Sequence, residues 1–401
     1  MGHRPGTGAD LSGRHFDVAC VGCGPAGNLS AWLLARAGHS VLLLDRAALP
    51  RQKTCGGGLS ARALALLPFP VDAVVHRHMQ GARLSLAGRL LADIDSAAIG
   101  AMIERAEFDR FMSLQAQAAG AELWPQTALE DFSQDAERVQ LRTSRGNCSA
   151  RLLIGADGAH SPIRRRLFAR WKPRWAFGIE ARFSWPAAGP AQALPLDRAL
   201  FDFAALRQGY GWIFPKRDHF NVGVYRLHKT AATSGLRAQL ARFAGLHGGL
   251  SACQPDAAVG HPIPLSTGRQ PVALGRVVLV GDAAGLGEAF LGEGIAFALD
   301  SATRAAAWAS HALLRNAAPS ASAYRRALAP LISELHYSLR IAQLLYRLPQ
   351  PILQGTAAHP AVQRLVIDLL RGQRSYRSTF WALLWRVPSI MLGRRAPAQA
   401  H

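Results

Sequence analysis

The fold is decided by residues 17–46, DVACVGCGPAGNLSAWLLARAGHSVLLLDR, which read as a strand, a glycine turn, a helix and a second strand. Val18–Val21 is a short apolar run with β-branched residues, as a buried parallel strand requires. Gly22, Gly24 and Gly27 then form the pattern G-x-G-x-x-G. In this pattern the first glycine makes a tight turn, the second lets a pyrophosphate approach the backbone, and the third lets helix and strand pack closely. The stretch therefore predicts a dinucleotide-binding turn.

The residues after this turn complete the unit. Pro25 suits the first turn of a helix, where its missing N–H would be unpaired anyway, and Gly38 suits the left-handed end of that helix. Val41–Leu44 is the second strand, and Asp45 after it can accept hydrogen bonds from ribose hydroxyls. A diphosphate at the helix start would meet exposed N–H groups and the positive end of the helix dipole.

The composition is that of a globular protein. The chain has 401 residues, 49% of them hydrophobic, and a net charge of +20. It contains no run of about 18 apolar residues, so no transmembrane helix is predicted. Residues 1–15 lack the apolar segment of a secretory signal and are expected to form a disordered leader. Arginines are spread along the chain apart from clusters such as Arg164–Arg166, so nucleic-acid binding is not expected, whereas an anionic membrane surface or an acidic partner protein fits the charge.

Five cysteines, an odd and sparse number, are typical of reduced thiols in the cytoplasm. Cys20 and Cys23 lie within the first strand and the glycine turn, and we expect small packing residues there rather than a redox pair. Cys55 lies in the loop LPRQKTCGGGLS, residues 49–60, before three consecutive glycines. Because glycine loses much conformational entropy on folding, this loop indicates backbone that passes close to a flat ligand. The Cys55 thiol then either contacts that ligand or belongs to an inert small residue in a turn.

Short strands and one helix follow. The helix is predicted at residues 103–119. The predicted strands are a hairpin at residues 79–95 and single strands at 122–124, 139–143 and 149–154. The last strand leads to Asp157-Gly158, a carboxylate in a glycine turn, and Ser161 is placed to cap a following helix.

The second half of the chain contains another strand that ends at a carboxylate. Val277–Val280 is apolar and leads to Gly281-Asp282. A long alanine-rich helix is expected from Gly294-Ile295 to about residue 314.

An aromatic strand precedes that region, in the sequence GYGWIFPK. Tyr210, Trp212 and Phe214 are expected either to line an apolar tunnel or to form ordinary sheet core. The next residues, Lys216 and Arg217, are expected in a solvated hairpin turn.

Residues 316–401 are expected to be helical, in segments broken by Pro349, Pro351, Pro360 and Pro388. Residues 380–392 combine aromatic and aliphatic residues with arginines, among them Trp381, Trp385 and Arg386. This pattern fits either a helix at a membrane interface or a terminal helix packed on its own domain.

The glycine turn, Asp157-Gly158 and Gly281-Asp282 resemble, in order and spacing, the three FAD fingerprints of the flavoproteins related to p-hydroxybenzoate hydroxylase. Within that superfamily, three motifs resemble the geranylgeranyl reductase family, whose members use FAD to saturate isolated double bonds of isoprenoid chains. They are KTCGGG at residues 53–58, Y-x-W-x-F-P-K at 210–216 and GDAAG…GEGI at 281–295.

The resemblance implies an α/β fold with a Rossmann-like FAD-binding domain of the glutathione reductase type, an inserted, mostly antiparallel β-sheet substrate domain and a helical C-terminal region. The implied boundaries are residues 16–75, 100–168 and 270–315 for the FAD-binding domain, 76–99 and 169–269 for the substrate domain, and 316–401 for the helices.

The resemblance also implies which residues contact FAD, position by position. They are Gly22, Gly24, Ala26, Gly27 and Arg105 at the diphosphate, Asp45 at the adenosine ribose, Leu129 at the adenine, Cys55, Gly56 and Gly58 at the isoalloxazine, Asp282 at the ribityl or diphosphate, and Gly294 and Ile295 at the O2/N1 edge of the flavin. Arg46 and Asp157 are further expected contacts of FAD. The sequence departs from the family at Ala289 and Leu291, where a proline and a threonine are usual. That loop faces the reactive edge of the flavin.

In the reaction that the resemblance implies, Cys55 either delivers a proton to the alkene or fixes the geometry of the flavin and the substrate. Tyr210 and Trp212 line a dry, apolar tunnel. The substrate would be a lipophilic small molecule, and no metal is expected. Because the chain has a single G-x-G-x-x-G, the electron donor would bind transiently, either as NAD(P)H or as a reduced carrier protein. The expected location is the cytoplasm, with peripheral membrane contact through the C-terminal region.

Two other functions remain open. The first is a monooxygenase or halogenase-like flavoprotein that acts on an aromatic group, such as a Trp or Tyr of a partner protein. The motif around Tyr210 resembles a halogenase signature, with tyrosine in place of its first tryptophan. The second is a flavoprotein that binds or matures a partner protein through the arginine-rich C-terminus without turning over a small molecule.

Overall fold

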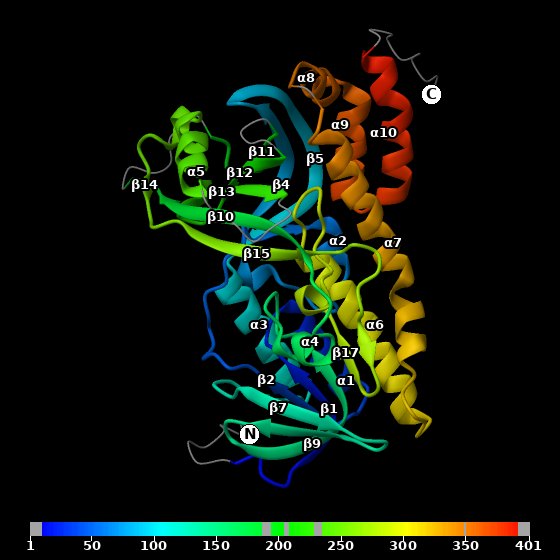
Figure 1. Ribbon diagram of the computed structural model, residues 1–401. Helices are drawn as coiled ribbons and strands as arrows, with labels where there is room; N and C mark the ends of the chain where they lie inside the picture. Colours follow the sequence, from blue (N-terminus) through cyan, green and yellow to red (C-terminus); the bar gives the residue numbers. More distant parts are fainter. Residues whose placement is uncertain (1–9, 187–193, 204–207, 228–234, 349, 392–401) are drawn as a thin grey trace.

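The computed structural model describes residues 10–186, 194–203, 208–227, 235–348 and 350–391. The described residues form two β-sheets, one at each end of an elongated molecule, with helices along one side (Figure 1).

The first sheet grows from the apolar strands of the opening stretch. Its strand order is β16-β17-β9-β1-β2-β6, and β1 lies parallel to both β2 and β9. Residues 18–20 are fully buried because the strand has a neighbour on each side and α1 packs against it. The strands are β1 (His15–Val21), β2 (Val41–Leu44), β6 (Glu122–Trp124), β7 (Leu129–Gln134), β8 (Val139–Thr143), β9 (Gly146–Gly155), β16 (Ala273–Leu274) and β17 (Val277–Leu279).

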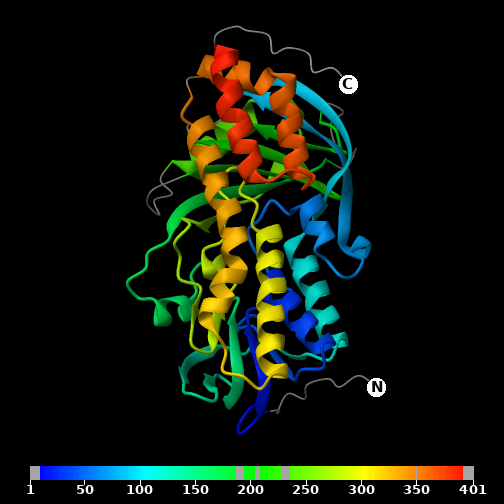
Figure 2. The same ribbon diagram turned by 90° about the vertical axis from the view of Figure 1, so that its right-hand side faces the viewer.

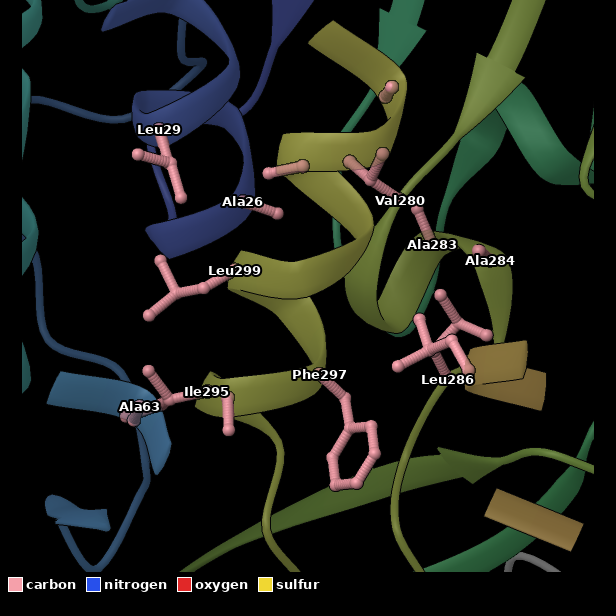
Figure 3. Close-up of a cluster of buried hydrophobic side chains, with 14 of the residues drawn as sticks. Ala26, Leu29, Ala63, Val280, Ala283, Ala284, Leu286, Ile295, Phe297 and Leu299 are labelled. Carbon is pink, nitrogen blue, oxygen red and sulfur yellow. The ribbon is translucent and has the colours of Figure 1, made fainter. Parts of the chain in front are cut away.

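Helices with small residues cover this sheet. Helix α1 (Pro25–Arg36) lies against α6 (Ile295–Leu314) and α3 (Arg105–Ala118). Figure 3 shows the small Ala26 of α1 and the bulkier Leu299 of α6 in the same buried cluster. Such pairing of small with large residues lets helices approach closely. The remaining elements of this end are α2 (Ala61–Ala65), α4 (Pro162–Leu167) and the short 3-10 turns η1 (Asp72–Val74) and η3 (Gly281–Ala284).

The second sheet is mostly antiparallel, in the order β14-β10-β13-β12-β11-β4-β5-β3, with β15 also paired to β10. Its only parallel pair among the described strands is β11 with β4. Its elements are β3 (Gly58–Ser60), β4 (Val75–Leu86), β5 (Arg89–Ile103), β10 (Arg174–Ser184), β11 (Arg198–Asp202), β12 (Gly209–Pro215), β13 (His219–Leu227), β14 (Gln254–Pro255), β15 (Val259–Leu265), α5 (Leu236–Gly245) and η2 (Gly248–Leu250).

Four helices close the fold. Helix α7 (Ala321–Leu345) runs beside α6 and then past the second sheet (Figure 2). The others pack near the second sheet and are α8 (Gln350–Ala358), α9 (Pro360–Leu370) and α10 (Tyr376–Met391). Pro388 lies inside α10 and does not end it, contrary to the sequence prediction. Within the described part of the chain, no helix is both long and apolar enough to cross a membrane.

The fold class is confirmed, with two corrections to the predicted limits. Residues 1–9 lie outside the described residues, but Leu11 is fully buried, so the end of the predicted leader is part of the fold. Strand β3 and the last residues of β5, up to Ile103, pair within the second sheet, although both were assigned to the FAD-binding domain. The loop of residues 49–60 thus supplies a short edge strand, which its three glycines did not predict because glycine is unfavourable in strands.

Candidate functional site

A cavity of about 1040 Å³ is lined by both sheets. The first sheet contributes the turns after β1, β2, β9 and β17, at the carboxyl ends of parallel strands where open α/β sheets bind their ligands. All but Gly27 of the predicted site residues line it, namely Gly22, Gly24, Ala26, Asp45, Arg46, Cys55, Gly56, Gly58, Arg105, Leu129, Asp157, Tyr210, Trp212, Asp282, Gly294 and Ile295.

The glycine turn has one position open to the cavity. A Cβ atom added at Gly27 would lie 1.9 Å from the carbonyl oxygen of Gly22, so this glycine serves the contact between helix and strand. A Cβ atom at Gly24 would meet only the Arg51 guanidinium, at 3.8 Å. Gly24 is also the N-cap of α1, and no side chain caps that helix end. The first N–H groups of α1 and the space beside Gly24 therefore suit an anionic group such as a diphosphate.

Asp157 gives a second observation that fits FAD. Its Oδ2 accepts a hydrogen bond from the Ile163 N–H at 3.1 Å, and Ser161 caps α4 as predicted. Its Oδ1 is buried and has no hydrogen-bond partner among the described residues. A buried unpaired oxygen costs about 1–3 kcal/mol, which a ligand hydroxyl or N–H would remove. Burial raises the pKa of this carboxyl, as expected for a site that is completed by a ligand.

The predicted ribose acceptor is already part of a network. Asp45 Oδ2 accepts the Cys23 N–H at 2.8 Å and the Arg51 Nε–H at 3.1 Å, and Oδ1 accepts the Ala47 N–H at 2.9 Å. A carboxylate has about four acceptor sites, so one remains for a ribose hydroxyl. Cys23 and Cys20 are buried free thiols, which confirms that they are packing residues.

Arg105 is held rigidly at the cavity wall. Asp109, one helical turn along α3, accepts its Nε–H at 2.9 Å and its Nη2–H at 2.8 Å. Both side chains are buried, and the guanidinium lies beside the Cys55 thiol. Asp109 takes two of the five N–H donors of the guanidinium, and the place of Arg105 on the cavity wall is in keeping with its predicted contact to a diphosphate.

The second sheet supplies an aromatic wall. Tyr210, Trp212 and Phe214 on β12 line the cavity together with Phe201 and Tyr225 from the neighbouring strands. The ring centres of Tyr210 and Tyr225 are 5.3 Å apart, and those of Phe201 and Phe214 are 5.4 Å apart. The three residues of β12 are thus sheet core and cavity wall at once. The wall offers an apolar surface to a ligand.

The polar atoms of two of these rings are already used. The Tyr210 hydroxyl donates to the Leu291 carbonyl, and Trp212 Nε1–H donates to Asn221 Oδ1 at 2.7 Å. Burial raises the pKa of Tyr210 above its ordinary value. Tyr210 and Trp212 therefore line the cavity with their rings, while their polar atoms bond to other parts of the chain.

The loop that departs from the family, residues 288–291, is fixed by side chains. The carboxylate of Glu288 accepts the N–H groups of Phe290 and Leu291 at 2.6 and 2.7 Å. The hydroxyls of Tyr210, Tyr225 and Tyr346 donate to three successive carbonyls, those of residues 291, 289 and 290. These bonds supply the rigidity that a proline would otherwise give to the loop.

Packing within the protein accounts for part of the glycine run after Cys55. Cβ atoms added at Gly56 would meet Trp212 Nε1 at 3.0 Å, and at Gly57 they would meet the Ile103 carbonyl oxygen at 2.1 Å and Lys216 Nζ at 2.5 Å. The protein's own atoms therefore require glycine at position 57 and leave little room for a side chain at position 56, although all three glycines border the cavity. The sequence could not show which atoms fill that space, because they come from strands far along the chain.

Lys216 corrects the sequence prediction most clearly. It was expected in a solvated turn but is fully buried, and its Nζ donates to the carbonyls of Gly56, Gly57 and Ile103 at 2.7, 3.2 and 2.7 Å. Burial lowers the pKa of this ammonium to about 8. The adjacent Arg217 is exposed, as predicted.

Sequence reasoning also missed a cluster at the cavity edge. Lys53 Nζ lies 2.6 Å from Nε2 of His261 on β15 and 3.7 Å from Asp282 Oδ2. Burial and the neighbouring Lys53 charge lower the pKa of His261 to about 4, so at neutral pH its Nε2 accepts from the ammonium. Lys53 stood in a recognised motif, whereas a histidine within a strand carries no signal of its own. No group of three or more metal-ligating side chains occurs in the described ranges.

Comparisons with known proteins agree with this geometry. A model of the FAD binding domain matches residues 15–173. Menaquinone reductase of Mycobacterium tuberculosis is 32% identical over 312 residues, which cover 72% of this chain and 75% of the relative. Geranylgeranyl diphosphate reductase of Rhodobacter capsulatus is 30% identical over 314 residues, which cover 76% and 77%.

A solved structure extends the agreement to the fold. The geranylgeranyl bacteriochlorophyll reductase-like protein of Thermoplasma acidophilum superposes with a TM-score of 0.78 at 22% identity, covering 95% of this chain and 98% of the other. The helical C-terminal region is thus included in the shared fold. With relatives of about 30% identity over three quarters of its length, an FAD binding domain and a cavity whose free groups fit that cofactor, the chain is an FAD-dependent oxidoreductase of the geranylgeranyl reductase family.

Proposed function

We propose that the protein reduces a C=C bond of an isoprenoid chain or another lipophilic substrate. The observation that carries this proposal is the aromatic wall of β12, which faces the same cavity as the FAD-binding turns and the Cys55 loop. An isoprenoid chain has no charge to anchor it, so its position must come from apolar contact. The names of the relatives, which include reductases of geranylgeranyl diphosphate and of menaquinone, support this substrate class.

The residues would divide the work between binding and proton transfer. When bound and reduced, FAD supplies a hydride to one alkene carbon. The other carbon needs a proton, and the half-buried Cys55 thiol on the cavity wall is the donor we propose. The π bond breaks as the two C–H bonds form, and the thiolate is reprotonated from water. Tyr210, Trp212 and Phe214 exclude water and hold the chain, because an unactivated alkene offers no carbonyl to polarise.

The electrons would come from a donor that binds transiently. The chain has one G-x-G-x-x-G, which the FAD site uses, so a permanent second dinucleotide site has no motif in the sequence. NAD(P)H and a reduced carrier protein are the two donors that we propose, and reduction of the holoprotein under nitrogen by each in turn separates them.

Oxidation of the reduced holoprotein tests the proposed function. The protein is reduced under nitrogen and then mixed with a prenyl lipid or with O₂ in a stopped-flow instrument. We expect rapid prenyl-dependent oxidation in the wild type. In Cys55→Ser we expect the same FAD content and oxidation slower by about 10²-fold or more, as for a lost proton donor. Equal rates in the two proteins would exclude Cys55 as the donor, and oxidation by O₂ alone, with hydroxylation or halogenation of an aromatic substrate, would favour the oxygenase alternative.

We further propose that α10 contacts an anionic membrane surface. Its inner face packs through Leu383, which is buried, and Phe380, whose ring centre is 5.7 Å from that of Tyr337. Its outer face exposes 47% of Trp381 and 80% of Trp385, at the i, i+4 spacing that places both on one side of a helix. The sequence from residue 369 to 401 contains arginines and no acidic residue. Leu370, the last residue of α9, lines the cavity, so a lipid surface at α10 would lie near the substrate site.

Vesicle binding tests this contact. The double variant Trp381→Ala/Trp385→Ala should lose most of its co-sedimentation with anionic phospholipid vesicles, whereas Leu314→Ala, an exposed leucine at the end of α6, should behave like the wild type. Salt should weaken wild-type binding, because charge is screened over about 10 Å at 0.1 M. Equal binding of wild type and double variant would make α10 a structural helix only.

A further inference from the structure

Two buried ionisable side chains beside the Cys55 loop have no part in the reaction proposed above. Lys216, at the turn between β12 and β13, has no solvent exposure, and Glu180 on β10 is 7% exposed. Lysine and glutamate are almost never this buried unless their charge is paired or hydrogen-bonded. The atoms that they bond therefore indicate what the two side chains do.

The bonds of Lys216 all go to the main chain around the loop. An ammonium has three N–H donors, and here they reach the carbonyl oxygens of Gly56, Gly57 and Ile103. Ile103 N–H also donates to the Gly57 carbonyl, at 2.8 Å. The lysine thus ties two consecutive residues of the loop to the end of β5.

Glu180 holds the same loop from its other side. Its Oε1 accepts the backbone N–H of Cys55 at 2.8 Å. Within the loop, the Gly57 N–H donates to the Cys55 Sγ at 3.4 Å. One N–H before the glycines and two carbonyls within them are therefore fixed by opposite charges, one from strand β10 and one from the turn between β12 and β13.

We propose that Glu180 and Lys216 are positioning residues that clamp the Cys55–Gly57 segment to the second sheet and thereby hold the Cys55 thiol at its place on the cavity wall. The importance of that place for turnover rests on the proposed function, whereas the clamp itself does not.

The surroundings of Glu180 make the clamp sensitive to pH. The groups that face it are the Cys55 N–H, the Lys216 ammonium, the Asn221 side chain and the Glu104 carboxylate, which itself lies 3.2 Å from His219 Nε2. Burial raises the pKa of Glu180 to about 6, in spite of the N–H bond from Cys55 and the charge of Lys216. Below that pH the carboxyl is neutral and a weaker acceptor, so the segment is held less firmly.

Alkylation of Cys55 in the FAD-bound protein tests the clamp without any substrate. Cys55 is half-buried, whereas the other four cysteines are buried, so mass spectrometry of iodoacetamide-treated protein reports mainly on its thiol. Lys216→Met keeps the length of the side chain but removes its donors, and we expect Cys55 to be alkylated about tenfold faster or more. Glu180→Gln still accepts the Cys55 N–H but cannot titrate. We expect a wild-type to variant rate ratio that rises as the pH falls from 7 to below 6, where only the wild-type carboxylate is neutralised.

Asp202→Asn is the matched control. Asp202 is also a fully buried carboxylate that accepts main-chain N–H groups, those of Ala87 and Gly88 at 2.8 and 2.6 Å, but at the tip of another hairpin. Its variant should alkylate like the wild type. The proposal is wrong if Lys216→Met folds, binds FAD and alkylates at the wild-type rate, or if the ratio for Glu180→Gln does not change with pH. If Lys216→Met does not fold, the ratio for Glu180→Gln decides alone. If the alkylation rates behaved as expected but the reduced holoprotein were not oxidised by a prenyl lipid, only the proposed function would be contradicted.

Discussion

The two glycine-rich segments that border the cavity use glycine for different reasons. At Gly24, in the turn after β1, the missing side chain leaves open space, with only Arg51 within 4 Å of a Cβ atom placed there. At Gly57, after Cys55, the same space is filled by the Ile103 carbonyl and the Lys216 ammonium. Gly24 thus keeps room for a ligand, and Gly57 keeps room for the rest of the protein.

This difference shows what a run of glycines can and cannot indicate. Gly24 and Gly57 both line the cavity, but a side chain would collide with atoms of the chain only at Gly57. Only the structure reveals whether the colliding atoms belong to the chain. Substitutions in the two segments should therefore separate loss of cofactor from loss of stability.

The largest expected effect is that of Gly24→Val on FAD. The valine side chain would occupy the space beside the first N–H groups of α1 that a diphosphate needs, so the protein should purify folded and colourless. Absorbance at flavin wavelengths measures the FAD content, and thermal unfolding of the apoprotein measures the fold. Gly245→Ala, at the end of α5 with no atom within 4 Å of its added Cβ, is the control and should purify yellow. A yellow Gly24→Val protein would refute the assignment of the diphosphate to this turn.

The second effect contrasts two adjacent glycines. Gly57 has a φ of +65°, and an added Cβ would lie 2.1 Å from a carbonyl oxygen, so Gly57→Ala should destabilise the protein by about 3 kcal/mol. Gly58→Ala would place its Cβ 3.5 Å from the Phe214 ring, an ordinary contact, and should change stability by less than about 1 kcal/mol. Urea unfolding of both holoproteins measures the difference. If the two variants were equally stable, the second segment would not be packed as described.

The two segments also differ in how well their structure could be predicted from the sequence. The unit from β1 to Asp45 could be predicted almost to the residue, because its strand, turn, helix and acid are consecutive and each has a local signal. The helix from Ile295 to Leu314 was also predictable, since its periodicity is local. The clamp on Cys55 was not, because Glu180 and Lys216 lie 125 and 161 positions after it and become its neighbours only when β10 and β12 pair with β13.

Lys216 illustrates why a buried charged residue is predicted wrongly to be exposed to solvent. A lysine after a proline, before an arginine and an aspartate, reads as a solvated turn on any local criterion. Burial of its ammonium becomes favourable only because three carbonyls from two distant segments meet there. Long-range contacts of this kind leave no trace in spacing or composition.

The smallest expected effect is a pH dependence of stability that arises from Glu180, the carboxylate that holds the second segment. Burial raises the pKa of Glu180 from its ordinary 4.5 to about 6, so between these values the folded state holds a proton that the unfolded state has released. Its contribution to stability is therefore full below pH 4.5 and is lost as the pH rises through 6. At 1.36 kcal/mol per pKa unit, the wild type should lose about 2 kcal/mol relative to Glu180→Gln across this window. Urea unfolding of both proteins at several pH values from 4 to 7 measures this loss. If the free energies of unfolding of the two proteins changed in parallel with pH, the pKa of Glu180 would not be raised by its burial beside Cys55, and the prediction would be wrong.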